Sequence, residues 1–348
     1  MDFPSAQRYD NLPEISIFAP QKKYMGETGT HTSTATVVKN TGSHYLLSEL
    51  PQWKPVKAVV RGKLRLSGST ATNPVAVGDR VEYSVPVDAQ GEPSDEATIT
   101  KVLPRKNYII RKSTNLSRQC HILASNIDTA YLIVTLDCPD TKWPFIDRFL
   151  VTCEAYKVPV TIILNKTDLY GGSGELSAKS QLFHAIYEDA GYSIMDISVL
   201  TGEGVDTLRQ QCNRGGISLF SGVSGVGKSS LIKAIDPALD PKTSEISDKY
   251  RQGRHTTTFY EIYPVHGGGF IIDTPGIRGF GLVEIEPEEI STYFPEMLRV
   301  ADNCRYKPCT HTHEPGCAVL EAVENGSISP ERYMSYLGML EEEGKYRQ

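Results

Sequence analysis

The chain has 348 residues, of which 39% are hydrophobic and 22% charged, and its formal net charge is −6. These values are typical of a globular protein that is long enough for two or three domains. They exclude a protein that is basic overall, so any surface for nucleic acid must be local. The first sixteen residues are acidic and lack an apolar stretch, and the apolar runs elsewhere are too short to span a bilayer. We therefore expect a cytoplasmic protein with no membrane partner.

The N-terminal third predicts a tail followed by a small barrel. Residues 1–33 are rich in turn-forming residues and show no periodicity. Residues 34–104 contain five short alternating stretches separated by turn signals such as "NTGS", a pattern typical of a small β-barrel.

The positive charge of the chain gathers in two stretches of this region, 54–65 and 101–118. They predict either an RNA-binding surface or strand faces that are simply solvated. The same two interpretations remain for three aromatic residues of this region, Trp53, Tyr45 and Tyr83, because each could stack on a base or pack against the barrel.

Residues 115–285 have a different pattern, in which apolar runs alternate with helical stretches. This alternation predicts a parallel sheet covered by helices on its faces. Polar loops follow the apolar runs, and open sheets of this kind bind ligands at the carboxyl ends of their strands.

The stretch "GVSGVGKSS" has the pattern of a phosphate-binding loop between a strand and a helix. Its glycines allow the backbone N–H groups to face phosphate oxygens, Lys228 can reach the β- and γ-phosphates, and Ser229 can ligate Mg²⁺. The predicted phosphate contacts are Gly222, Val223, Ser224, Gly225, Val226, Gly227, Lys228, Ser229 and Ser230.

The stretch "NKTD", residues 165–168, fits a loop that reads guanine. Asp168 can accept hydrogen bonds from N1–H and from the exocyclic amine, and Asn165 can reach the O6/N7 edge. The stem of Lys166 can lie over the ring, and Thr167 completes the motif. Taken alone, the four residues also fit an Asn-capped turn. Ser198 follows another predicted strand and is suited to place a backbone amide at guanine O6.

The stretch "DTPG", residues 273–276, ends a further predicted strand. Asp273 would hold Mg²⁺ through water, and the Gly276 amide would sense the γ-phosphate. A type I turn is the alternative explanation of this motif. Three motifs on three strand ends favour a GTP site, but the base-reading loop precedes the phosphate loop, the reverse of the common order.

With these motifs, the chain resembles the circularly permuted GTPases, in particular the ribosome small subunit-dependent branch. The resemblance begins near residue 34. It implies an α/β protein with an N-terminal OB-fold domain that binds RNA (34–104), a circularly permuted P-loop GTPase domain (115–285) and a C-terminal zinc-binding helical domain (286–348). It also implies GTP hydrolysis to GDP in late maturation of the 30S subunit, with the 30S particle and 16S rRNA as partners. We expect a monomer.

The stretch "GRHTTT", residues 253–258, is the first switch segment under this resemblance. Many GTPases carry a water-orienting Gln directly after the DxxG motif, but this chain has Ile277 there. His255 is the replacement that we favour as a catalytic group, together with Lys228, although His255 could instead pack the switch or contact RNA. Either Thr256 or Thr257 should bind Mg²⁺ in the GTP state.

The stretch "CRYKPCTHTHEPGC" predicts a metal site near the C-terminus. Three thiolates and one imidazole suit a closed, structural Zn²⁺ site. The spacing matches the family pattern at Cys304, Cys309, His311 and Cys317, whereas His313 falls outside it. Free buried cysteines are the alternative.

Two rival functions remain at the level of sequence. An RNA-binding assembly chaperone would carry GTP only as a passive ligand, but Lys228, Ser229 and Asp273 are all present. A metal-handling GTPase would need an open or His-rich metal site, and the predicted ligand set is full.

Overall fold

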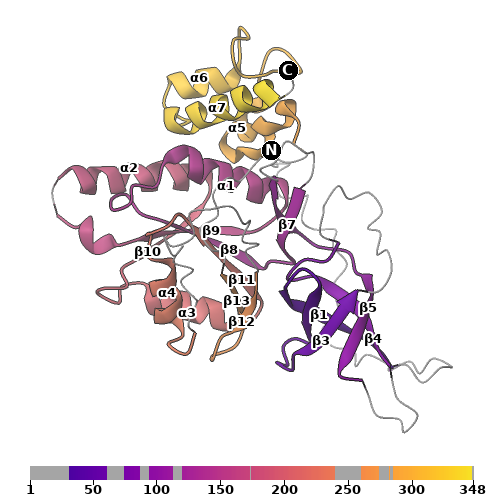
Figure 1. Ribbon diagram of the computed structural model, residues 1–348. Coiled ribbons are helices and arrows are strands. Elements are labelled where there is room, and N and C mark those ends of the chain that lie inside the picture. Colours follow the sequence, from indigo (N-terminus) through magenta and orange to yellow (C-terminus); the bar gives the residue numbers. More distant parts are fainter. Residues whose placement is uncertain are drawn as a thin grey trace, which may run out of the picture.

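A computed structural model describes residues 31–60, 74–86, 94–112, 120–172, 174–239, 260–273, 282 and 285–346, without the side chains of residues 31, 111, 112, 120 and 343–346. Figure 1 shows a β-barrel, a sheet with helices on both faces and a group of C-terminal helices. This architecture confirms the predicted α/β fold with an N-terminal barrel.

The barrel contains β1 (His31–Asn40), β2 (His44–Ser48), β3 (Val56–Val60), β4 (Arg80–Val85) and β5 (Glu96–Val102). It closes in the order β1-β2-β3-β5-β4, which is OB-like. β1 begins ahead of residue 34, where we expected the barrel to start. The sequence alternation appears in the structure as inward-facing side chains such as Val37, Leu47 and Ile99. Tyr45 and Tyr83 belong to the same buried core, so neither offers an open ring face to a base.

A two-stranded hairpin follows the barrel along the chain. It consists of β6 (Tyr108–Lys112) and β7 (Cys120–Ser125), which pair antiparallel.

The central sheet has six strands in the order β10-β9-β8-β11-β13-β12. They are β8 (Thr129–Val134), β9 (Val160–Asn165), β10 (Ser193–Ile197), β11 (Ile217–Gly222), β12 (Ile262–Pro264) and β13 (Phe270–Asp273). All neighbouring pairs are parallel except β12 with β13. The central strands are apolar along their length because helices cover both faces of the sheet.

Two helices lie on each face of this sheet (Figure 1). On one face, α1 (Trp143–Ala155) and α2 (Glu175–Ala190) pack into the larger hydrophobic core. On the other face, α3 (Val205–Asn213) and α4 (Lys228–Ile235) pack into a second core.

The C-terminal segment forms a helical module against α1. It comprises the 3-10 helix η3 (Pro287–Tyr293) and the helices α5 (Pro295–Ala301), α6 (Ala318–Glu324) and α7 (Pro330–Tyr346). The core of the module also includes Val151 of α1, so the module and the sheet domain share packed side chains. Across the described residues, no helix combines the length and hydrophobicity that crossing a membrane requires.

Candidate functional site

The parallel sheet brings the predicted nucleotide motifs to one edge. β9 ends at Asn165, β10 ends directly before Ser198, β11 ends at Gly222 and β13 ends at Asp273. Because these strands run parallel, their carboxyl ends meet at the same edge of the sheet. Segments that are more than 100 residues apart in the sequence, such as Asn165 and Asp273, therefore border a common site.

The phosphate loop is shaped by glycines and anchored from below. Gly227 has φ +92°, and a Cβ built on it would lie 2.5 Å from Asn165 Nδ2. A Cβ on Gly222 would lie 2.6 Å from the Ile133 carbonyl oxygen. Val226 is buried in the core beneath the loop, and α4 begins at Lys228. The first turn of α4 thus opens at the loop, the arrangement in which a helix N-terminus meets phosphate.

Asn165 joins the base-reading loop to the phosphate loop. Its Nδ2 donates a hydrogen bond of 2.7 Å to the Val226 carbonyl oxygen. Only 2% of Asn165 is exposed, and its Oδ1 has no hydrogen-bond partner among the described residues. A buried amide oxygen of this kind is a group that water or a ligand would satisfy.

Asp168 is exposed in the 3-10 helix η2 (Thr167–Leu169), which follows the start of the base-reading loop, and Ser198 orients it. The Ser198 hydroxyl donates to Asp168 Oδ1 at 2.6 Å and accepts from the Thr201 amide at 3.2 Å. The Ser198 backbone N–H donates to the Glu203 carbonyl oxygen at 3.1 Å. This N–H is engaged within its own loop, and which backbone amide of the loop would face guanine O6 stays a prediction. The contact of the Ser198 side chain with Asp168 was not expected from the sequence.

Lys228 and Asp273 lie at the phosphate end of the site, where they form a largely buried ion pair. Ser229 is half-buried on the first turn of α4. A magnesium-bound triphosphate would offer each charged residue a partner of opposite sign, the phosphates for Lys228 and the cation for Asp273. The donor set therefore fits a magnesium nucleotide.

The predicted switch residues lie outside the described part of the chain. They are Arg254, His255, Thr256, Thr257, Gly276 and Ile277.

Comparisons with known proteins agree with this architecture. The RsgA GTPase family model matches residues 102–283. The chain is 52% identical, over 89% of its length and 98% of the relative's, to the small ribosomal subunit biogenesis GTPase RsgA of Bacteroides fragilis. The chain belongs to the RsgA GTPase family. The RsgA of Flavobacterium psychrophilum is 46% identical over 88% of this chain and 92% of its own length.

Two solved structures have a similar fold. YjeQ from Thermotoga maritima aligns with a TM-score of 0.68 and 32% identity, over 89% of this chain and 98% of that one. YloQ, described as a circularly permuted GTPase, aligns with a TM-score of 0.64 and 25% identity, over 92% and 97% of the two chains. The reversed motif order of this RsgA-family chain is therefore the permutation inferred from its sequence.

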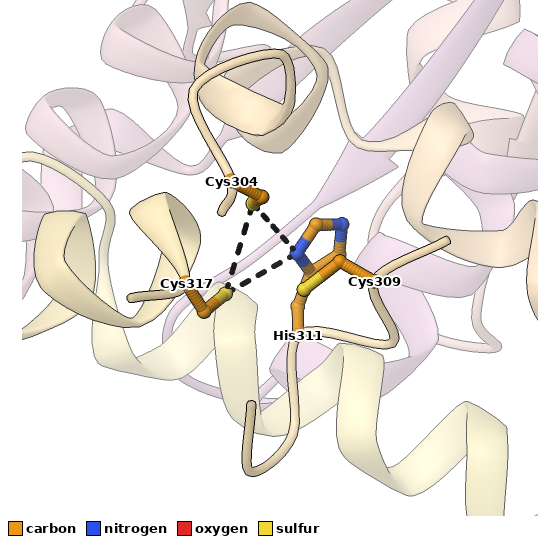
Figure 2. Close-up of side chains that lie close together, drawn as sticks. All are labelled: Cys304, Cys309, His311 and Cys317. Carbon is orange, nitrogen blue, oxygen red and sulfur yellow. Dashed lines mark hydrogen bonds between the residues drawn. The ribbon is translucent and has the colours of Figure 1, made fainter. Parts of the chain in front are cut away.

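The Cys/His cluster lies in the C-terminal module, where the four ligand atoms all lie within 4.8 Å of one another (Figure 2). The Sγ atoms of Cys304 and Cys317 are 4.0 Å apart, and His311 Nδ1 is 3.6 Å from the first and 3.4 Å from the second. With Zn–S bonds of about 2.3 Å and Zn–N bonds of about 2.0 Å, a tetrahedral ion separates its ligands by roughly 3.5–3.8 Å. The cluster, which Cys309 completes, is compatible with zinc.

Burial favours the neutral forms of three side chains in this cluster. It raises the pKa of the Cys309 thiol to about 12, raises that of Cys317 and lowers that of His311. Without a cation, the thiols of Cys309 and Cys317 would stay protonated at neutral pH. A divalent metal would displace those protons and stabilise the thiolates.

Residues that the sequence did not single out hold the loop of the cluster. The Glu314 carboxylate accepts hydrogen bonds from the amides of Thr310, Thr312 and His313. Burial alone would raise its pKa, but the hydrogen bonds from Thr310 and from the backbone lower it below the usual range. His313 is thus a backbone donor here and is not one of the four clustered residues.

Two basic residues near the barrel form ion pairs but differ in exposure. Arg105 is nearly buried and pairs with Asp79 at 2.6 Å, and Lys106 pairs with Asp128. Arg105 therefore serves an internal contact and is removed from any RNA surface, whereas Lys106 is about half exposed and stays at the surface. Trp53 is 37% exposed and stacks on Phe270, with ring centroids 6.0 Å apart.

Proposed function

We propose that this protein hydrolyses GTP to GDP during late maturation of the small ribosomal subunit. One observation carries the proposal, namely that four strand ends bring "NKTD", Ser198, the phosphate loop and Asp273 to one edge of the sheet. The relatives that share about half of its sequence are named small ribosomal subunit biogenesis GTPases.

In this proposal Asp168 binds the N1–H and exocyclic amine of guanine, with its carboxylate oriented by the Ser198 hydroxyl. Asn165 binds the O6/N7 edge, and Lys166 covers the ring. Thr167 extends the same loop, where its hydroxyl donates to Glu203 at 3.2 Å.

At the phosphate end, the backbone of residues 222–230 cradles the phosphates and Lys228 neutralises their charge. Bound Mg²⁺ supplies further neutralisation of the triphosphate, and Ser229, Asp273 and one of Thr256 and Thr257 hold it. Gly276 senses the γ-phosphate, and His255 positions the attacking water.

We further propose that Cys304, Cys309, His311 and Cys317 hold one structural Zn²⁺ per chain. We assign 30S particles and 16S rRNA as partners and the cytoplasm as the compartment, with the protein acting as a monomer. The OB-like barrel (34–104), the GTPase domain (115–285) and the zinc module (286–348) are the units in which it works, behind a tail (1–33).

The decisive experiment measures GTP turnover with and without purified 30S subunits. The free protein should turn over slowly, because the site is incomplete until a partner orders it, and 30S subunits should accelerate it. If turnover stays at background in both conditions while GTP still binds, the passive RNA-binding chaperone is the better assignment.

Asp168→Asn tests the base assignment, because the substitution inverts the donor and acceptor pattern at guanine. GDP affinity should fall by roughly 10⁴-fold, with xanthosine diphosphate gaining affinity. If ATP competes with labelled GDP for the wild-type protein at equal concentration, the base assignment is wrong.

His255→Ala tests the catalytic assignment. It should leave GDP affinity intact and lower 30S-stimulated turnover by roughly 10- to 10³-fold, the range for loss of a positioned acid–base group. Undiminished stimulation would place the catalytic group on the ribosome.

A further inference from the structure

The central strand β8 also ends at the site, and no motif had marked the loop that follows it. In the sheet, β8 lies between β9, which leads into "NKTD", and β11, which leads into the phosphate loop. We call residues 136–140 the β8 loop. Its position between the two recognised loops follows from the strand order, because all three strands are parallel.

The β8 loop contacts both neighbours. Lys166 Nζ, from the base-reading loop, donates a hydrogen bond to the Cys138 carbonyl oxygen. On the other side, a Cβ built on Gly225 of the phosphate loop would lie 3.4 Å from Pro139 Cδ. The loop thus touches the residue assigned to cover guanine and a glycine of the phosphate cradle.

Two side chains outside the β8 loop, Tyr170 and Lys179, hold it in place through hydrogen bonds. The Tyr170 hydroxyl accepts from the Leu136 amide at 2.9 Å and donates to the Asn165 carbonyl oxygen at 3.0 Å. Lys179 Nζ, on α2, donates to the Leu136 carbonyl oxygen at 3.0 Å and pairs with Asp140 at 2.6 Å. The hydrogen bonds therefore form a chain from α2 through the β8 loop to Lys166 and Asn165.

We propose that the β8 loop is a third wall of the guanine-nucleotide site and that Lys179 and Tyr170 are its positioning residues. The Cys138 carbonyl oxygen holds the Lys166 ammonium, so the stem of Lys166 stays extended where a guanine ring would lie. Preorganisation of this kind strengthens binding because fewer rotamers are lost when the nucleotide arrives. The inference rests on the proposed function of the site.

The test compares two lysines that share one carboxylate. Lys142 also pairs with Asp140, at 2.7 Å, but it is mostly exposed and this bond is to the side chain of Asp140 and not to the backbone of the β8 loop. Lys179→Met should accelerate GDP release about 10-fold, the effect of losing one charge-assisted hydrogen bond, whereas Lys142→Met should release GDP at the wild-type rate. Lys179→Met should also raise KM for GTP and leave 30S-stimulated kcat within about twofold, because the bonds of Lys179 go to Leu136 and Asp140 and not to the phosphate loop.

Cys138 provides a second readout that needs no substitution. Its thiol is exposed, whereas the thiols of Cys153, Cys212, Cys304 and Cys317 are buried. Saturating GDP should slow the alkylation of Cys138 by iodoacetamide, followed by peptide mass spectrometry.

The outcomes distinguish failure of the proposed function from failure of the proposed role of the β8 loop. If the wild-type protein fails to bind GDP, the proposed function is wrong and the third wall falls with it. A different result would overturn only the proposal for the β8 loop. In that case the wild type binds GDP, Lys179→Met and Lys142→Met release GDP at the same rate, and GDP does not change the rate of Cys138 alkylation.

Discussion

The C-terminal module and the barrel are attached to the sheet domain by different chemistry. At the C-terminal joint, Arg332 of α7 is 1% exposed and pairs with Asp147 of α1 at 2.8 Å and with Glu296 of α5 at 2.7 Å. Its guanidinium lies 4.7 Å from the Phe294 ring centroid and 5.7 Å from that of Tyr187. One side chain thus connects three helices across the joint.

At the barrel joint, main-chain carbonyl groups of residues 77 and 78 accept two of the connections, and side chains make the others. The Ser125 amide donates to the Val77 carbonyl oxygen at 2.9 Å, and the Asn126 side chain donates to the Gly78 carbonyl oxygen at 2.9 Å. Asp79 adds a buried carboxylate that accepts from Ser125 Oγ at 2.5 Å and pairs with Arg105.

This difference decides how each joint fails. A joint made by one buried charge depends on that side chain, because a lost partner leaves its counter-charges buried and unpaired. The part of the barrel joint that main-chain groups make tolerates most side-chain changes and fails where the backbone itself cannot accept a side chain. The four predictions below test this contrast.

The largest effect is expected for Arg332→Met, which keeps the volume of the side chain and removes its charge. Asp147 and Glu296 would remain buried without their cation, and breaking a buried pair in this way costs about 3–5 kcal/mol. Urea unfolding should show this loss in the free energy of unfolding, together with weaker protection of α1 and α7 against hydrogen exchange.

Arg299→Met is the matched control at the same joint. Arg299 is exposed and donates to the Asp189 carbonyl oxygen at the end of α2. Its loss should change the free energy of unfolding by no more than about 1 kcal/mol, as for other surface contacts. Equal losses in both variants would show that burial of Arg332 is not what secures the module.

The second prediction concerns zinc removal, because α7 serves the cluster as well as the joint. The Tyr333 hydroxyl donates to the His311 carbonyl oxygen at 2.7 Å, and the Tyr336 hydroxyl donates to the Thr310 carbonyl oxygen at 2.6 Å. A ligand present at 100 times its Kd stabilises the state that binds it by about 2.7 kcal/mol. Chelation should therefore lower the protection of α6 and α7 by a similar amount and leave the barrel unchanged.

Cys304→Ser should reproduce the effect of chelation, and Cys212→Ser is the control. Cys212 is a free, buried cysteine of α3, outside the four-residue cluster. The variant at Cys304 should contain less than one zinc per chain by mass spectrometry of the native protein, and the control should match the wild type. Full zinc in a Cys304/Cys309 double variant would remove the basis of this prediction.

Most of the candidate site could be predicted from the sequence because its chemistry is local. The glycines of residues 222–230, the "NKTD" motif and Asp273 follow strands directly, so the rule that parallel strands end at one edge places them together. The four Cys/His positions lie within fourteen residues, so their spacing alone predicts a cluster.

The contacts that could not be predicted join segments with no shared motif. Arg332 and Asp147 are 185 positions apart, and nothing in the sequence of α7 distinguishes Arg332 from a solvated helical charge. Tyr45 and Tyr83 show the converse case, because a barrel aromatic can face inward or outward until the strand register is known. The contact between the Ser198 hydroxyl and Asp168 was missed because the two residues are 30 positions apart and lie in loops after different strands.

The third prediction breaks the main-chain joint at Gly78. This residue has φ +90°, and a Cβ built on it would lie 2.0 Å from the Ser125 carbonyl oxygen. Gly42, in the same barrel, has φ +92° but no atom within 4 Å of its built Cβ. Gly42→Ala thus measures the backbone strain alone, which is about 1–2 kcal/mol for an L-residue in this conformation.

Gly78→Ala should lower the free energy of unfolding by about 1–3 kcal/mol more than Gly42→Ala does. This excess is the cost of an overpacked contact that cannot relax easily. The excess should appear in urea unfolding and as faster hydrogen exchange in β7. Equal losses for the two variants would mean that the approach of Gly78 to Ser125 does not hold the barrel in place.

The smallest effect is expected at another contact between barrel and sheet, where Lys39 Nζ of β1 lies 2.8 Å from Glu261 Oε2. Both side chains are about one-third exposed, at 34% and 29%, so water and salt screen the pair. Backbone pairing between the same two residues also remains when the charge is removed. Lys39→Met should therefore cost no more than about 1 kcal/mol at low salt and less at 1 M salt.

Lys101→Met is the control, because Lys101 pairs with Glu82 inside the barrel at 3.5 Å and is more exposed. Both variants should fall in the same narrow range of unfolding free energy. A loss in Lys39→Met that approaches the loss in Gly78→Ala would show that a side-chain charge secures the barrel after all, and the contrast between the two joints would then be wrong. A small loss in Lys39→Met that disappears at about 1 M salt would instead support the contrast. It would show that salt screens this charge pair, whereas main-chain hydrogen bonds depend little on ionic strength.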